Sequence, residues 1–408
     1  MILEAKHTDL LQADLQTINR LGDDAVFVDW YNSACGLGGT IEPKPIITTF
    51  SGTNEGPKYS VISITWKDVD KLVDAFMEME TDELQDSKCV EFLYKLNPLV
   101  EPLAWTKPGQ TLIFSPYSNL HRIPLYALKI NGEVIIKRNP IVYCSSLSAL
   151  VNTYRVRMQM DPQHGSTQST AHVPNTEDSN PTRRLDGTLE VSLFSQPPTL
   201  DGHAALKATA TKFKAKAHIG ESFTASSFTS TIQSLGLQLL YYHGHADFSA
   251  TAPIDHCLIF SDRNLTLRDV FNLSSPLSHS AGFHVTLLGC GTGMSKTAPT
   301  ENVIGLVPSL LYAGALSTVS TLWPFSDEDA AAYSESFYEG FLGGEGGGTG
   351  VGEQGAEEVP PSADDVVVNM AKLNQKAVLG IMRERPELYH WAPFVLNGYW
   401  MIRSPLHK

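Results

Sequence analysis

Two residues with the chemistry of a base and a nucleophile come at the ends of apolar stretches in this sequence. The stretch Leu237–Tyr242 leads directly into His243, and the stretch His284–Gly289 leads directly into Cys290. A thiolate is a strong nucleophile, and a neighbouring imidazole can take up the thiol proton near neutral pH. Each residue is followed by a glycine, which permits a sharp turn and leaves the preceding side chain open to a substrate.

The surrounding sequence predicts the elements that position this pair. The predicted strands are Ala25–Trp30, Tyr59–Trp66, Thr111–Ser115, Lys137–Cys144, Leu189–Ser195, Leu237–Tyr242, His284–Gly289, Ala315–Leu322 and Pro393–Ile402. The predicted helices are Asp68–Met79, Gly202–Ala217, Asn302–Leu311, Asp327–Leu342 and Val366–Arg383. This alternation favours an α/β fold with a mostly parallel sheet and helices on both faces. Parallel strands bring their carboxyl ends to one edge, so we expect His243 and Cys290 there together, although 47 residues separate them in the chain.

Composition narrows the class of protein. The chain has 408 residues, 42% of them hydrophobic, and a formal net charge of −14, which argues against nucleic acid as a direct partner. Its five cysteines are scattered without a Cys-x-x-Cys pair, which favours a reducing compartment. The N-terminus lacks the apolar core of a secretory signal, and no apolar run is long enough to span a membrane. We therefore expect a cytoplasmic protein with no membrane contact.

Two polar stretches divide the chain. Residues 158–186 are rich in Ser, Thr, Asn, Gln and Pro, and predict a flexible linker between an N-terminal lobe, residues 1–157, and a C-terminal lobe, residues 187–408. Residues 343–365 are rich in Gly and acid, and predict a loop inserted between two helices of the second lobe.

The motifs around His243 and Cys290 resemble those of the CHAT domain, a cysteine peptidase domain related to caspases and separase. The matching segments are Tyr241–Asp247 (YYHGHAD), Leu287–Gly293 (LLGCGTG), Gly305–Ala315 (GLVPSLLYAGA), Thr321–Asp327 (TLWPFSD) and Trp391–Gly398 (WAPFVLNG). In the N-terminal lobe, Leu112–Pro116 and Leu120–Leu125 are similar to another segment of the family. The resemblance extends from about Ala25 to Ile402, and it implies a caspase-like sheet in which a pseudo-caspase lobe precedes an active one.

The resemblance also implies roles for individual residues. Cys290 corresponds to the nucleophile and His243 to the general base, and the backbone N–H groups of Gly244 and Cys290 correspond to the oxyanion hole. The family works with a dyad, so no third catalytic carboxylate is expected, and Asp247 is expected to be a solvated loop acid. The sequence departs from the family at Gly291, where relatives carry an acidic residue, and at Tyr242, where relatives often carry Cys.

For the S1 pocket, separase relatives use an acidic residue near the strand that follows the nucleophile. Asp327 and Asp329 lie in the matching region and could receive a basic P1 side chain, although an acid at this point is also favoured by the dipole of the following helix. The implied activity is that of a cysteine endopeptidase acting on a protein or peptide substrate, without a cofactor, under the control of a partner or signal.

Three other interpretations use the same residues. His243, His245, His256 and Cys257 carry zinc-ligating groups, but their spacing matches no common zinc pattern, so no metal is expected. The Gly-rich segment around Cys290 lacks the Lys-Ser/Thr ending of a phosphate-binding loop. The main alternative is a catalytically silent CHAT module that serves in signalling or assembly.

Overall fold

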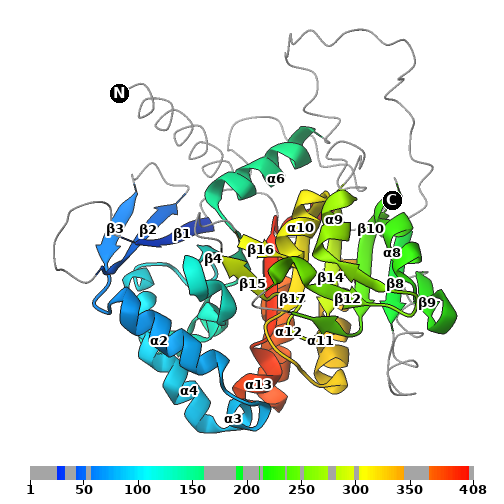
Figure 1. The fold of residues 1–408 in the computed structure, drawn as a ribbon. Coiled ribbons are helices and arrows are strands. Elements are labelled where there is room, and N and C mark those ends of the chain that lie inside the picture. Colours follow the sequence, from blue (N-terminus) through cyan, green and yellow to red (C-terminus); the bar gives the residue numbers. More distant parts are fainter. Residues whose placement is uncertain are drawn as a thin grey trace, which may run out of the picture.

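The structure is a computed structural model that describes residues 25–32, 43–51, 57–159, 190–195, 211, 215–234, 237–248, 252–273, 282–297, 303–343 and 367–403. These residues form one continuous sheet of eleven strands (Figure 1). In spatial order the strands are β3 (Lys58–Val61), β2 (Pro45–Ser51), β1 (Ala25–Asn32), β4 (Thr111–Ser115), β7 (Ile141–Tyr143), β19 (Phe394–Gly398), β17 (Ala315–Thr321), β14 (Phe283–Leu288), β10 (Leu237–His243), β8 (Glu190–Ser195) and β9 (Lys216–Ile219). Most of the predicted linker and of the Gly-rich insertion, residues 160–186 and 344–365, lies outside the described residues.

The sheet is mostly parallel, which confirms the predicted class. Two parallel groups, β1-β4-β7-β19 and β17-β14-β10-β8-β9, meet where β19 pairs antiparallel with β17. At the other end, β2 and β3 add an antiparallel edge. Because β19 comes from the C-terminal end of the chain and pairs with β7 as well as β17, the two halves share one sheet. The lobe boundary near residue 157 stays a prediction.

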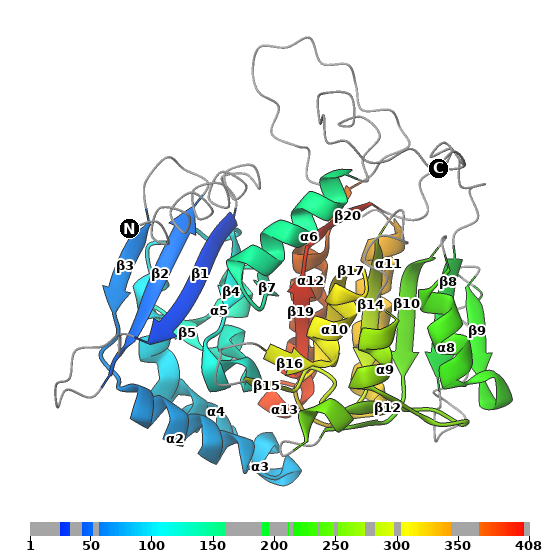
Figure 2. The same cartoon turned by 45° about the horizontal axis from the view of Figure 1, so that its top comes forward.

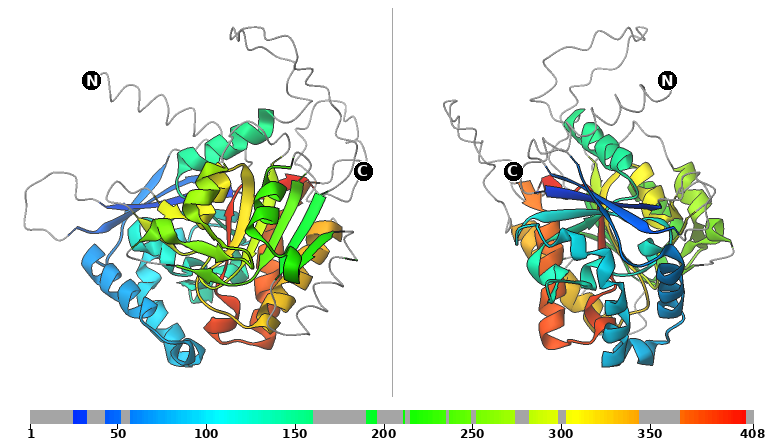
Figure 3. Two further views of the ribbon diagram at one scale, coloured as in Figure 1. Left: turned by 45° about the vertical axis from the view of Figure 1, so that its right-hand side comes forward. Right: turned by 90° about the vertical axis from the view of Figure 1, so that its left-hand side faces the viewer.

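Side chains on the C-terminal half alternate between two hydrophobic layers, as period-2 strands require. Leu240, Tyr242, Val285 and Leu287 belong to one buried cluster, whereas Leu239 belongs to the cluster on the opposite face. The helices α8 (Ala225–Ile232), α9 (Leu267–Asn272) and α10 (Leu306–Tyr312) cover the first face, and α11 (Asp327–Gly343) and α12 (Met370–Glu384) cover the second. Figures 2 and 3 show these two helical layers with the sheet between them.

The N-terminal half carries its own helices. They are α2 (Trp66–Met77), α3 (Thr81–Gln85), α4 (Ser87–Leu93), α5 (Ile135–Arg138) and α6 (Leu147–Gln159). Helix α2 begins where the Thr65 side chain accepts a hydrogen bond from the Asp68 N–H, and it buries Trp66, Val69, Val73 and Phe76 along one stripe. Helix α13 (Leu388–Trp391), from the C-terminal part of the chain, packs against α3. The short pairs β11 (Ala246–Asp247) with β12 (Cys257–Ile259) and β15 (Ser295–Thr297) with β16 (Val303–Gly305) lie beside the sheet.

Several predicted elements have different boundaries in the structure. The predicted strand Tyr59–Trp66 ends at Val61, because Thr65 caps helix α2. The predicted strand Lys137–Cys144 begins only at Ile141, and Lys137 lies in helix α5. The predicted helix Gly202–Ala217 is wrong at its end, where strand β9 runs; Thr211 is helical and most of its other residues lie outside the described part. The sequence analysis missed β2, whose burial depends on pairing with β1 and β3.

The predicted segments near the C-terminus also divide differently. Residues Val303–Gly305 form strand β16 before helix α10 begins, and Val367–Asn369 form strand β18 before helix α12. The predicted last strand is two strands, β19 and β20 (Met401–Arg403), and β20 pairs with β18. Within the described ranges, no helix is long and apolar enough to cross a membrane.

Candidate active site

His243 and Cys290 lie at one edge of the sheet. His243 is the last residue of β10 and pairs in register with Leu288, the last residue of the neighbouring parallel strand β14. Cys290 follows two residues later, where the chain leaves the ladder. The structure therefore brings the two residues to adjoining strand ends, as the order of parallel strands requires.

The alternation along β10 decides which way His243 faces. Tyr241 points toward helix α11, where its hydroxyl lies 3.2 Å from the Ser334 hydroxyl, and His243 shares that face. His243 Nε2 lies 3.3 Å from Oδ1 of Asp327, the first residue of α11. The imidazole is largely buried, whereas the Asp327 carboxylate is 40% exposed. The carboxylate therefore reaches the imidazole from the helix side.

A tight turn carries Cys290 out of the sheet. Gly291 has φ +67°, a left-handed backbone conformation that residues with a Cβ adopt at a cost. A Cβ at Gly289 would lie 2.9 Å from the Gly244 carbonyl oxygen, which leaves no room for a side chain. The glycines on both sides of the cysteine, including Gly291 where relatives carry an acidic residue, are therefore explained by the backbone of this turn.

Two threonines that the sequence analysis did not single out hold this turn in place. Thr292 donates its hydroxyl to the Leu287 carbonyl at 2.8 Å and accepts from the Thr321 N–H at 3.2 Å. Thr321, the last residue of β17, donates its hydroxyl to the Gly289 carbonyl at 2.5 Å. Both threonines are fully buried. They lie inside motifs that the sequence already showed, but only the pairing of β14 with β17 brings them together.

The surroundings of Cys290 favour the neutral thiol. Burial raises the pKa of Cys290, the negative charge of Asp327 raises this pKa further, and the cysteine's own backbone N–H opposes both effects. Cys290 is half-buried, whereas Cys89, Cys144 and Cys257 are buried. Among the cysteines in the described ranges, Cys290 is thus the accessible one.

The predicted oxyanion donors differ in their availability. The Gly244 N–H donates to the Leu288 carbonyl at 3.0 Å, as part of the parallel ladder. The Cys290 N–H faces its own sulfur atom. In this conformation the Gly244 N–H is occupied, so a part in an oxyanion hole requires that this bond open or become shared.

Asp329, predicted with Asp327 for the S1 pocket, is fully buried. Its Oδ1 lies 2.7 Å from Arg385 Nη1, and its Oδ2 lies 2.8 Å from His390 Nδ1 and accepts a hydrogen bond from the Ser326 hydroxyl at 2.7 Å. Both oxygens are therefore engaged inside the protein, and the carboxylate is not open to a substrate side chain. Asp329 instead links the start of α11 to Arg385, which precedes α13, and to His390, which lies in α13. These contacts position the neighbouring Asp327.

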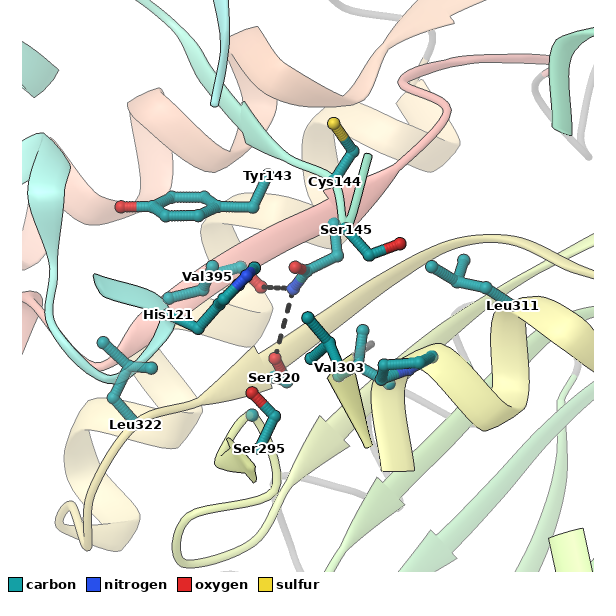
Figure 4. Close-up of a pocket in the computed structure, with 14 residues that line it drawn as sticks. His121, Tyr143, Cys144, Ser145, Ser295, Val303, Leu311, Ser320, Leu322 and Val395 are labelled. Atoms are coloured by element: carbon teal, nitrogen blue, oxygen red, sulfur yellow. Dashed lines mark hydrogen bonds between the residues drawn. The ribbon is translucent and has the colours of Figure 1, made fainter. Parts of the chain in front are cut away.

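Two cavities adjoin this region. Cys290 lines a groove of about 830 Å³. A smaller pocket of about 40 Å³ lies behind the turn at Cys290, between the two halves of the sheet, and Figure 4 shows His121, Ser295 and Ser320 around it. The Asn397 side chain donates to the Ser320 hydroxyl across this pocket at 3.4 Å. Of these two cavities, the larger groove is the one that Cys290 lines, so it offers room beside the thiol for a peptide.

The imidazole and thiol groups considered for zinc do not converge. His245 is exposed, whereas His256 is fully buried against Phe248. Within the described ranges, no three His, Cys, Asp or Glu side chains are placed to hold a metal ion.

Comparison with known proteins supports the fold and the family. Two crystal structures of the Saccharomyces cerevisiae separase–securin complex are similar to this chain, with TM-scores of 0.57 and 0.51 at 9% and 10% sequence identity. The similar regions cover 98% and 96% of this chain but only 31% of the longer chain in each complex. The fold is thus caspase-like, the class that the mostly parallel sheet and the motifs predicted.

A family model described as the CHAT domain matches residues 91–399, which is most of the chain. The protein therefore belongs to the CHAT-domain family, a family of caspase-like peptidases. No curated protein sequence matches the chain.

Proposed function

We propose that the protein is a cysteine endopeptidase in which Cys290 is the nucleophile and His243 the general base. The observation that carries this proposal is the placement of a half-buried thiol and an imidazole at adjoining ends of parallel strands, beside a groove of about 830 Å³. A peptide lying in that groove presents its carbonyl carbon to the sulfur atom.

The chemistry follows from these two groups. His243 accepts the thiol proton, and the Cys290 thiolate attacks the carbonyl carbon to form a tetrahedral oxyanion. His243 then protonates the leaving amine, which releases the first product and leaves a thioester on Cys290. Water, deprotonated by His243, hydrolyses the thioester and restores the thiol. The Cys290 N–H, and the Gly244 N–H once its ladder bond opens, are the proposed oxyanion donors.

Asp327 supports this assignment in one of two ways. Its contact with His243 Nε2 would fix the imidazole with Nδ1 as the nitrogen that exchanges protons with the thiol. Alternatively, its 40% exposed carboxylate receives a basic P1 side chain, which then competes with His243 for the same oxygen. The Asp327→Asn variant distinguishes these roles. An orienting role lowers kcat for every substrate, whereas an S1 role removes the preference for Lys or Arg at P1.

A protein partner is proposed to activate the enzyme. The raised pKa of Cys290 and the occupied Gly244 N–H describe a state in which the nucleophile is not yet ionised. The two similar separase structures are of complexes with a protein partner, securin. The raised pKa of Cys290 and the occupied Gly244 N–H also favour the second candidate function, a catalytically silent module that acts in signalling or assembly.

Cleavage of a fluorogenic peptide library by the wild-type protein and by its Cys290→Ala variant separates the two functions. A peptidase cleaves a subset of the library and loses this activity in the variant. Absence of cleavage together with absence of Cys290 labelling by peptidyl chloromethylketones supports the silent module.

A further inference from the structure

The groove beside Cys290 is built from both halves of the sheet. On the side of the nucleophile it is lined by Phe248, Met294 and Trp323. The other wall comes from the end of α2, the short connection after it and α3, and contributes Met77, Met79 and Leu84. The N-terminal half therefore forms part of the surface that any peptide at Cys290 must touch.

This wall is fixed to the groove floor. Phe76, next to Met77, packs edge-on against Trp323 with ring centroids 6.0 Å apart, and Leu84 is buried. Helix α3 contacts α13, whose residue Tyr389 accepts a hydrogen bond from Trp323 Nε1 through its carbonyl at 3.1 Å. The wall is therefore packed against the same core residues that support the groove floor.

The wall combines apolar and acidic side chains. Methionines fill irregular spaces and adapt to different apolar partners, so Met77 and Met79 suit a large aliphatic or aromatic side chain. Glu80 and Asp82 also line the groove and are exposed, whereas none of the described residues that line it is Lys, Arg or His. Asp82 has no ion-pair partner within the described part of the chain. The helix dipole of α3 favours an acid at this position but does not require it to face a groove.

We propose that the wall formed by Met77, Met79, Glu80, Asp82 and Leu84 selects peptides that carry a large apolar residue adjacent to a Lys or Arg. The apolar side chain lies against the methionines and Leu84, and the cation lies against Asp82 and Glu80. This inference rests on the proposed function, since it describes the recognition of the peptide that Cys290 would attack. It assigns specificity to the half of the protein that carries no nucleophile.

Binding to the Cys290→Ala protein tests the proposal without requiring cleavage. The probes are fluorescein-labelled octapeptides with Leu next to Lys, Leu next to Glu, and Ala next to Lys, and the measurement is fluorescence anisotropy. We expect the Leu-Lys peptide to bind about threefold to tenfold more tightly than the Leu-Glu peptide, with the preference weakening at high salt. We expect Ala in place of Leu to weaken binding as well.

Charge reversal provides the matched control. In the Cys290→Ala background, Asp82→Lys should reverse the preference between the Lys and Glu peptides. Glu91→Lys, which changes an exposed acid of α4 that does not line the groove, should leave the preference unchanged. Equal binding of both peptides, binding of none, or equal effects of the two reversals overturns the proposal.

The same probes keep the two proposals apart. Selective binding without cleavage by the wild-type protein leaves the recognition surface standing and overturns the peptidase assignment. Cleavage whose sequence preference is unaffected by Asp82→Lys leaves the peptidase standing and overturns the recognition surface.

Discussion

Each half of the sheet has a cysteine near the carboxyl end of a parallel strand: Cys144 follows β7 directly, and Cys290 lies two residues after β14. The two cysteines differ in their surroundings. In the N-terminal half, Cys144 follows β7, and its N–H donates to the Phe114 carbonyl at 2.8 Å, so the backbone continues the ladder. In the C-terminal half, Cys290 leaves the ladder on a turn that the left-handed Gly291 permits. A strand-end cysteine thus becomes accessible only where the chain turns away from the sheet.

The histidines of the two halves differ in a similar way. Burial lowers the pKa of His121 to about 4, and in Figure 4 the Cys144 sulfur points away from this imidazole. His243 instead faces the carboxylate of Asp327, which is partly open to solvent. Burial also raises the pKa of Cys144 far above its usual value. The N-terminal half thus holds the same residue types in a geometry without a usable thiolate.

The largest expected effect is on catalysis. Cys290→Ala and His243→Ala should each lower kcat/KM for a cleaved peptide by at least about a thousandfold, because removing either member of a nucleophile–base unit removes nearly all of its contribution. Cys144→Ala should retain activity. Circular dichroism and thermal unfolding should show that all three variants are folded. Peptidase activity that persists in Cys290→Ala contradicts the catalytic assignment.

Thiol reactivity should follow the same contrast. Iodoacetamide should alkylate Cys290 faster than Cys144 by on the order of a hundredfold at neutral pH, since Cys144 is buried and its pKa is raised more strongly. Asp327→Asn removes a negative charge that raises the pKa of Cys290, so alkylation of Cys290 should extend to lower pH in this variant. Peptide mass spectrometry after timed labelling measures both rates. Equal labelling of the two cysteines speaks against the difference between the halves.

Acid stability should depend on a buried histidine near the amino end of β14. His284 is fully buried, hydrogen-bonded to Ser317 and Thr286, and burial lowers its pKa to about 3. In the unfolded chain a histidine has a pKa of about 6.5. Between pH 3 and pH 6.5 the unfolded state therefore binds a proton that the folded state does not bind. The free energy of unfolding should therefore fall as the pH drops from about 6.5 toward 3, by up to about 1.4 kcal/mol per pH unit from this residue.

Urea denaturation at a series of pH values measures this dependence. His284→Gln keeps a hydrogen-bonding side chain but cannot take up the proton, so its stability should fall less steeply over the same range. His245→Gln, which changes an exposed imidazole, is the control and should keep the wild-type slope. An unchanged slope in His284→Gln would falsify the assignment.

The smallest expected effect on stability comes from replacing two glycines that have a left-handed backbone conformation. Gly291→Ala and Gly132→Ala, at φ +67° and +82°, should each destabilise the protein by about 1–2 kcal/mol through the strain of a Cβ. Only Gly291→Ala should also reduce peptide cleavage, because Gly132 lies in the turn between β5 (Lys129–Ile130) and β6 (Glu133–Val134) of the N-terminal half. Steady-state kinetics with both variants checks this, and a similar kinetic loss in Gly132→Ala contradicts the proposed role of the turn at Cys290.

The amino-acid sequence by itself determined the class of fold and the identity of the candidate pair. Apolar runs of strand length that end in His243 and Cys290 indicate buried parallel strands, since such strands are covered on both faces. The alternation of strands and helices predicted the mostly parallel sheet, and five ordered motifs identified the CHAT family. These features are local, so they can be read from short segments.

Only the tertiary structure decided what surrounds that pair. Asp327 and Asp329 are two residues apart in the chain, yet Asp327 contacts His243 while Asp329 is buried between Arg385 and His390. The wall of Met77, Met79 and Asp82 lies about 200 residues before Cys290 in the chain, and it reaches the groove because β19 joins the two halves into one sheet. Helical direction and strand pairing between distant segments set these contacts, and no local pattern of residues encodes them.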